Sequence, residues 1–158
     1  MLIRHWDPEK RFEGAVIKIY EHWVLEVSWQ QHTLACFILF CRHEKIRLQS
    51  ELSDGALRDL RRAMREIEVG LRKSPFAPDH FNYLQMGNAL PLLHFHGVPR
   101  YDSNRDLSKE LLGREVTDEN PGHFTPWSRE KITSEQMGRI HQLMQESLQY
   151  VCPADLKI

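Results

Sequence analysis

The feature that most constrains the fold of this chain is an uninterrupted apolar run at residues 34–41, Leu-Ala-Cys-Phe-Ile-Leu-Phe-Cys. The run has the length of a strand, and the polar segment at residues 42–45, Arg-His-Glu-Lys, ends it. A short apolar run with such bounds, rich in aromatic and branched side chains, is typical of a β-strand that is buried on both faces. It therefore predicts a central strand of a sheet.

Four further segments have the composition of strands. Residues 15–20 and 23–29 are rich in β-branched and aromatic side chains, and only a Glu-His pair separates them, so we expect a hairpin. Residues 81–86 and 91–98 are joined by a Gly-Asn-Ala segment of turn-forming composition. This spacing predicts that the second pair of strands is also antiparallel and adjacent.

Two segments have the periodicity and the capping residues of helices. Ser53 can cap a helix that ends before Pro75, since proline disfavours helical geometry in the residue before it. Its apolar residues recur at spacings of three and four, at Leu57, Leu60, Met64, Ile67 and Leu71. A second helix is predicted at about residues 133–151, because it begins with the Thr-x-x-Gln form of a capping box.

The segment at residues 100–131 has no clear periodicity. It is charged, contains glycines and prolines, and is too long for a simple connection. We expect an extended loop with one helical turn at about residues 107–112. The strand-rich order with two main helices predicts an α+β fold, and the chain length predicts a single domain over residues 1–158.

Charge and cysteine content limit which binding partners and which cellular compartment we expect for this protein. A net charge of −1 argues against binding of bulk nucleic acid, which needs a surplus of Lys and Arg. The three cysteines have no Cys-x-x-Cys spacing, which favours a reducing compartment. The N-terminal residues lack the apolar run of a secretory signal, and no stretch is apolar enough to span a bilayer. We expect a cytoplasmic protein without a membrane partner.

Two histidines within the segment at residues 91–98 are the most chemically specific feature of the chain. In a strand, His94 and His96 point to the same face, together with Leu92 and Val98. Three interpretations are open at this stage. The imidazoles can be a packed pair satisfied by backbone or solvent, two ligands of a metal site, or a reaction centre at phosphorus. No spacing of other histidines supplies a third metal ligand.

The surrounding sequence favours the third interpretation. The stretch at residues 79–101 resembles the signature of the histidine triad (HIT) family of nucleotide hydrolases and transferases, His-φ-His-φ-His-φ-φ with φ apolar, often followed by Pro-Arg. Aligned on the Pro-Arg pair, His96 takes the third position and His94 the central, nucleophilic one. Leu92 stands at the first position, where the family usually has histidine. The resemblance extends more weakly over residues 15–101.

This resemblance implies a HIT-like fold, with an antiparallel sheet of about five strands, a long helix after the third strand and a C-terminal helix. It also implies a homodimer and chemistry without a metal ion or another cofactor. His94 would attack the α-phosphate of a dinucleoside polyphosphate or a nucleoside phosphoramidate and carry the nucleotide covalently, while His96 would contact the phosphate. The nucleotide-binding positions that it implies are Asn82, Asn88, Ala89 and Arg100.

Two functions therefore stand side by side. The first is a metal-independent nucleotide hydrolase or nucleotidyl transferase that uses His94. The second is a catalytically weak member of the same fold that binds a nucleotide or a protein, because Leu92 and Ala89 replace residues that assist turnover in the family. A zinc-dependent enzyme is a third possibility, and it would require a stoichiometric metal ion.

Overall fold

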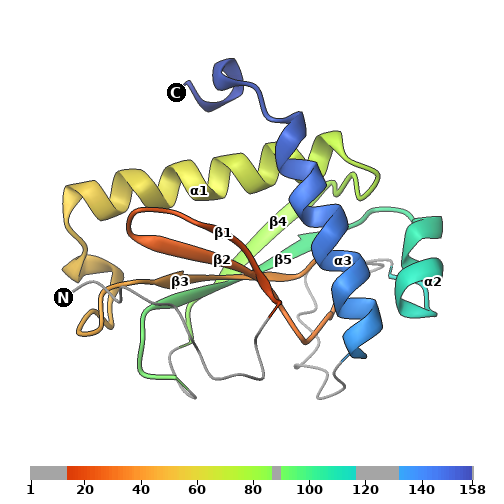
Figure 1. Ribbon diagram of the computed structural model, residues 1–158, viewed down its shortest axis with the longest axis horizontal. Helices are drawn as coiled ribbons and strands as arrows, with labels where there is room; N and C mark the ends of the chain where they lie inside the picture. Colours follow the sequence, from red (N-terminus) through yellow and green to blue (C-terminus); the bar gives the residue numbers. More distant parts are fainter. Residues whose placement is uncertain (1–13, 87–89, 117–131, 158) are drawn as a thin grey trace.

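The computed structural model describes residues 14–86, 90–116 and 132–157 of the chain. A five-stranded antiparallel sheet with the strand order β1-β2-β3-β5-β4 forms its centre (Figure 1). This sheet, with its helices, confirms the predicted α+β fold class. The strands are β1 (Val16–Ile19), β2 (Trp23–Val27), β3 (Phe37–Cys41), β4 (His80–Leu84) and β5 (His94–Arg100).

The apolar run at residues 34–41 forms the central strand, as predicted, but it enters the sheet three residues later than expected. Ala35 has a φ of 65°, a left-handed conformation that interrupts extended backbone. Residues 34–36 therefore belong to the connection from β2, and β3 begins at Phe37. β3 lies between β2 and β5 and contributes buried side chains on both faces, which confirms its central position.

Both predicted main helices are present. α1 (Asp54–Lys73) is capped by the Ser53 hydroxyl, which accepts a hydrogen bond from the Ala56 N–H, and it ends before Pro75 as expected. α3 (Ser134–Ser147) begins with the predicted capping box and continues as a 3-10 turn at Leu148–Tyr150. Further 3-10 turns lie at Gln49–Glu51 and Pro153–Leu156.

The predicted helical turn at about residues 107–112 is α2 (Asp106–Leu112), which ends at Gly113 with a left-handed φ of 69°. It lies beside the N-terminal part of α3 (Figure 1). No helix in the described ranges is long and apolar enough to cross a bilayer.

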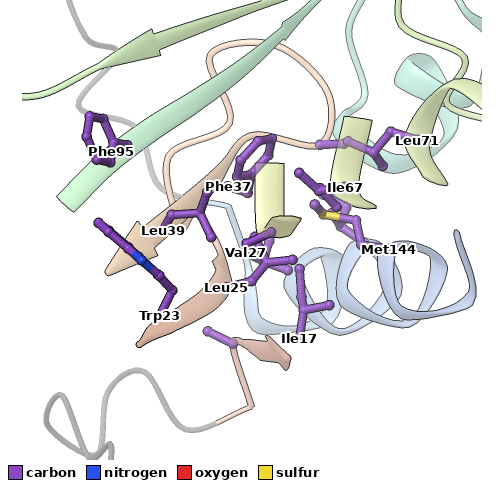
Figure 2. Close-up of a cluster of buried hydrophobic side chains, with 14 of the residues drawn as sticks. Ile17, Trp23, Leu25, Val27, Phe37, Leu39, Ile67, Leu71, Phe95 and Met144 are labelled. Carbon is purple, nitrogen blue, oxygen red and sulfur yellow. The ribbon is translucent and has the colours of Figure 1, made fainter. Parts of the chain in front are cut away.

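α1 and α3 cover one face of the sheet and enclose the core between themselves and the strands. Figure 2 shows side chains from both layers meeting there, among them Leu25 and Leu39 from the sheet, Ile67 from α1 and Met144 from α3. Gly97 permits a close approach of the Phe37 ring, because a Cβ atom at this position would lie 2.2 Å from that ring. Glycine is therefore required here by packing.

β5 carries the histidines on the face opposite this core. Phe95 packs against Trp23 in the core with ring centroids 5.8 Å apart. Because side chains alternate along a strand, His94 and His96 point to the other face of the sheet. The strand begins at His94 and continues to Arg100, so the predicted bounds of 91–98 were wrong at both ends, and Leu92 precedes the strand instead of sharing its face.

Candidate functional site

The imidazole of His94 is fixed by the main chain just before its own strand. The side chain is buried, and Nδ1 lies 2.7 Å from the carbonyl oxygen of Leu92. A carbonyl oxygen only accepts hydrogen bonds, so Nδ1 carries the proton and donates it. In the neutral ring the lone pair is then on Nε2, which can act as a nucleophile.

Two aromatic neighbours hold the ring of His94 in place. The Phe40 ring on β3 lies at a centroid distance of 5.5 Å, and Phe40 is also the cross-strand partner of His94. The His96 ring meets His94 edge to face, with centroids 5.0 Å apart and an angle of 70° between the planes. The His94 ring is thus restrained by one hydrogen bond and two ring contacts.

His96 is neutral at physiological pH. Burial, and then the charges of His94 and His32, lower the pKa of the His96 imidazole to about 4. A neutral imidazole has one N–H donor and one acceptor. His96 can therefore donate a hydrogen bond to an anionic oxygen beside His94, although it does not supply a positive charge.

The sheet aligns two rows of side chains across this face. Phe40 on β3 separates Val24 from His94, and Ile38 separates Glu26 from His96. Glu26 is only 2% exposed, so the strand register brings a buried carboxyl group into the row of His96. The sequence analysis did not single out Glu26, although one acidic residue within an otherwise apolar strand was a signal for it.

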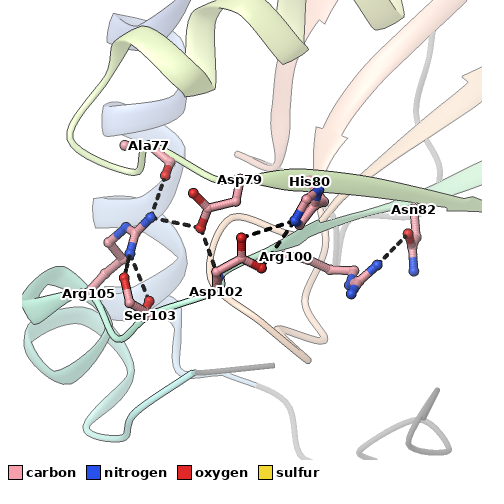
Figure 3. A network of polar contacts seen from close by, with 8 residues as sticks. All are labelled: Ala77, Asp79, His80, Asn82, Arg100, Asp102, Ser103 and Arg105. Carbon is pink, nitrogen blue, oxygen red and sulfur yellow. Dashed lines mark hydrogen bonds and ion pairs between the residues drawn. The ribbon is translucent and has the colours of Figure 1, made fainter. Parts of the chain in front are cut away.

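Asn82 and Arg100 contact each other, and Arg100 lies farther along β5 than the histidine pair. Arg100 Nη1 is 3.4 Å from the Asn82 side-chain oxygen (Figure 3), and Asn82 pairs with Val98 in the sheet. Arg100 is four residues beyond His96, which corresponds to roughly 13 Å along an extended strand. We call the start of β5, with His94 and His96, the histidine end, and the last part of β5, with Arg100 and its partner Asn82, the arginine end.

A polar network connects the start of β4 with the residues that follow Arg100 (Figure 3). Asp79 accepts hydrogen bonds from the Asp102 N–H at 2.8 Å and from Arg105 at 2.9 Å, and these contacts lower the pKa of the Asp79 carboxyl group. His80 contacts the Asp102 carboxylate at 3.1 Å. The network joins the start of β4 to the end of β5 and so supports the arginine end.

Two of the predicted nucleotide-binding residues, Asn88 and Ala89, lie outside the described residues, and their placement stays a prediction. Within the described ranges, no group of three or more His, Cys, Asp and Glu side chains could hold a metal ion. Leu92, which the sequence comparison aligns with the first histidine of the triad signature, contributes its carbonyl oxygen to His94. That contact belongs to the main chain and does not depend on the side chain at this position.

Solved structures with the same fold are histidine triad proteins. The protein from Marinobacter aquaeolei VT8 matches with a TM-score of 0.64 at 20% identity, over 94% of this chain and 98% of that one. The protein from Sinorhizobium meliloti 1021 matches with a TM-score of 0.65 at 17% identity, over 88% and 94%. A hypothetical histidine triad nucleotide-binding protein from Sulfolobus tokodaii strain7 matches with a TM-score of 0.63 at 14% identity, over 85% and 83%.

In sequence comparisons, no protein-family model and no curated protein matches this chain. These solved structures share 20% identity or less with this chain, so the similarity concerns the fold. The strand order and the helix positions of this chain are those expected for a HIT-like fold. The chain therefore adopts the HIT-like fold, the α+β fold of the histidine triad proteins.

Proposed function

We propose that this protein is a nucleotide hydrolase or nucleotidyl transferase that acts at an α-phosphate through a covalent nucleotidyl-His94 intermediate. The observation that carries the proposal is the hydrogen bond from His94 Nδ1 to the Leu92 carbonyl, which leaves the lone pair on Nε2. A neighbouring neutral imidazole, His96, and the HIT-like fold support the same chemistry.

The first step follows from this arrangement. His94 Nε2 forms a bond to the α-phosphorus, and the bond from phosphorus to the leaving group breaks, with its electron pair departing on that group. The ring becomes positively charged, and the Leu92 carbonyl, which already accepts from Nδ1–H, stabilises this charge. An N–H of His96 donates to a phosphoryl oxygen as negative charge develops there. In the second step, a water oxygen forms a bond to phosphorus, the bond between phosphorus and Nε2 breaks with its electron pair returning to the imidazole, and the water proton is released to solvent.

The substrate class is a dinucleoside polyphosphate or a nucleoside phosphoramidate. Arg100 and Asn82 lie on the side of β5 farther from His94, where a guanidinium and an amide suit a more distant phosphate or a ribose hydroxyl. Asn88 and Ala89 retain their proposed places in nucleotide binding. No metal ion or cofactor takes part in this proposal.

The replacement of the first triad histidine by Leu92 bears on the rate. Because the contact to Nδ1 comes from the main chain, the orientation of the nucleophile survives the replacement. This observation favours an active enzyme over the second candidate, a member of the fold that binds a nucleotide or a protein partner without turnover.

The proposal includes a cytoplasmic homodimer. β4 is an edge strand, and strand edges present unpaired backbone groups to a second chain. Beside α1 lies a groove of about 450 Å³, lined in part by Leu57, Leu60 and Met64. Burial of the exposed Leu57 and the half-buried Met64 by a second copy would stabilise a dimer. All three cysteines are free, which fits a reducing compartment.

The decisive experiment is to trap the intermediate. We expect that brief incubation of the purified protein with an adenosine phosphoramidate, followed by acid-free denaturation and mass spectrometry, detects an adenylyl group on the peptide that contains His94. Release of adenosine monophosphate should accompany it. Binding of adenosine monophosphate in calorimetry, without an adduct or turnover, would instead establish the second candidate function.

A further inference from the structure

The peptide group between Leu92 and Leu93 orients the proposed nucleophile, and it is itself held from its other side. Its carbonyl oxygen lies 2.7 Å from His94 Nδ1, and its N–H donates a hydrogen bond to the Ile46 carbonyl at 3.1 Å. A trans peptide group is planar, and its C=O and N–H point in opposite directions. The Ile46 carbonyl therefore fixes the direction in which the Leu92 carbonyl faces His94.

Ile46 lies in a largely exposed turn between β3 and α1, and two side chains of this turn fix its main chain. The Arg47 guanidinium donates from Nη1 to the carbonyls of Glu44 at 2.6 Å and Ile46 at 3.2 Å. The Glu51 carboxylate accepts from the N–H groups of Arg47 at 2.8 Å and Leu48 at 2.9 Å. A carbonyl oxygen has two lone pairs, so the Ile46 carbonyl accepts both of its hydrogen bonds at once.

The side chains of Arg47 and Glu51 are exposed, so their contribution to the global stability of the fold is small. Hydrogen bonds from the main-chain N–H groups of Arg47 and Leu48 lower the pKa of the Glu51 carboxyl group, which is therefore ionised at neutral pH. Hydrogen bonds to an ionised acceptor are stronger than those between neutral groups. The two side chains thus restrain the main chain locally without a large effect on unfolding.

We propose that Arg47 and Glu51 are positioning residues for the His94 nucleophile. They fix the Ile46 carbonyl, and this carbonyl fixes the peptide group that holds the His94 ring. The inference rests on the proposed function. As Nε2 attacks phosphorus, positive charge develops on the ring, and Nδ1–H donates more strongly to the Leu92 carbonyl. A peptide group whose N–H is already hydrogen-bonded is the better acceptor, so the same contact stabilises the charged ring.

The first test measures the orientation of His94 in the free protein. Glu51→Ala removes the acceptor of two main-chain N–H groups, and we expect the Leu93 amide proton to exchange with solvent at least about tenfold faster than in the wild type. Nitrogen-15 NMR of the labelled imidazole should show a larger fraction of His94 with its proton on Nε2. Glu51→Gln retains an acceptor oxygen and should restore most of both signals, and Arg47→Ala should reproduce the changes through the other side chain.

The second test follows formation of the adduct. The rate of adenylyl transfer from an adenosine phosphoramidate to His94 should fall about tenfold in Glu51→Ala, less than the roughly 10²-fold that a misplacement of 1 Å can cost. KM should stay close to the wild-type value, because the groups that we propose to bind the nucleotide are unchanged. Glu51→Gln should recover most of the rate.

The matched control is Asp155→Ala. The Asp155 carboxylate also accepts a main-chain hydrogen bond at a 3-10 turn, from the Cys152 N–H at 2.8 Å, but this turn packs against α1. The substitution therefore removes a comparable contact from a turn that does not hold the Leu92–Leu93 peptide. It should leave the amide exchange of Leu93 and the rate of adduct formation unchanged.

The outcomes separate the positioning role from the proposed function. Wild-type exchange at Leu93 and a wild-type His94 tautomer in both Glu51→Ala and Arg47→Ala would refute the positioning role, whether or not the protein turns over. Faster exchange with an unchanged rate of adduct formation, or an equal loss of rate in Asp155→Ala, would refute it as well. Absence of any adduct in wild-type protein would refute the proposed function itself, and the NMR comparison would still decide whether these side chains orient His94.

Discussion

His22 and His43 form one pair of contacting imidazoles, and His94 and His96 form another, but the two pairs use their ring nitrogens differently. His22 Nδ1 and His43 Nε2 are 2.9 Å apart, and the rings are stacked with 16° between their planes. One ring donates and the other accepts, so each satisfies the other. In the second pair the rings meet edge to face at 70°, and His94 bonds to the main chain.

The difference shows which contacts leave an imidazole available for chemistry. In a hydrogen bond between two neutral imidazoles, the accepting ring uses its lone pair inside the protein. A histidine whose N–H is bonded to a carbonyl retains its lone pair on the opposite nitrogen, in a fixed orientation. Proximity of two histidines is therefore a weaker indication of a site than the identity of the group that orients them.

The largest effect is expected from a substitution that removes one histidine of the pair on β5. His94→Ala removes the proposed nucleophile, and we expect kcat/KM for an adenosine phosphoramidate to fall by a factor on the order of 10⁴ or more. Adduct formation should disappear in mass spectrometry. Retention of the adduct or of turnover in this variant would exclude His94 as the nucleophile.

The matched control breaks the other pair. His22→Ala removes one partner of the hydrogen bond to His43, so we expect the free energy of unfolding to fall by about 1–2 kcal/mol. The kinetic constants should change little in the same protein at a temperature where it is folded. If turnover fell as strongly as in His94→Ala, the two pairs would not differ as the structure indicates.

A smaller effect is expected from His96→Ala. This substitution removes one donor to the phosphoryl oxygens but leaves the nucleophile and its carbonyl partner, so kcat should decrease by about 10²–10³-fold. Rapid-quench measurements with His96→Asn, which retains an N–H donor, should show partial recovery. Equal activity of His96→Ala and the wild type would remove His96 from the reaction.

Acid should destabilise the molecule through both pairs. The pKa of His96 is lowered to about 4, and burial also lowers the pKa of His43. A folded-state pKa below the unfolded value favours the neutral ring in the folded protein, so its stabilisation is complete above about pH 6.5 and is lost as the pH falls toward 4. For half-buried His96 this corresponds to about 1–3 kcal/mol.

Denaturant titrations at pH 7 and pH 4.5 measure this loss. The decrease in unfolding free energy should be smaller in His96→Asn than in the wild type, and His43→Asn should remove a separate part of it. A pH dependence identical in wild type and both variants would contradict the assignment of these imidazoles.

The smallest expected effect concerns the first triad position. Leu92→His changes the side chain but retains the carbonyl that orients His94. We therefore expect kcat/KM to change by less than about tenfold, below the 10²–10⁴ that a proton-transferring side chain supplies. Steady-state kinetics of the wild type and of Leu92→His measure this change. A gain in kcat/KM of about a hundredfold or more would show that the lack of an imidazole at position 92 limits the reaction.

Sequence reasoning predicted most of the fold because its signals are local. Ser53 and Thr133 cap the two main helices as expected, since a cap depends on residues only three positions apart. It failed where a connection has an irregular backbone that apolar composition does not indicate. The start of β3 depends on Ala35, whose left-handed conformation lies in a connection held by Gln31.

For the candidate site, the sequence predicted His94 and His96 as neighbours on one face, because alternation along a strand is a property of the backbone. It did not predict that Leu92 contributes a carbonyl, since nothing in the identity of a residue specifies its main-chain partner. It also did not predict that Asn82 on β4 and Arg100 on β5 contact each other.

The sequence by itself therefore determined the strands, the main helices and the two histidines of β5, because apolar periodicity and capping act over a few residues. Only the tertiary structure decided which groups meet at those histidines. Glu26 reaches the row of His96 through the pairing of β2, β3 and β5, and the Thr33 hydroxyl donates a hydrogen bond to the Pro99 carbonyl on β5. Such contacts join residues more than 60 positions apart along the chain, and packing and register set them, not the local sequence.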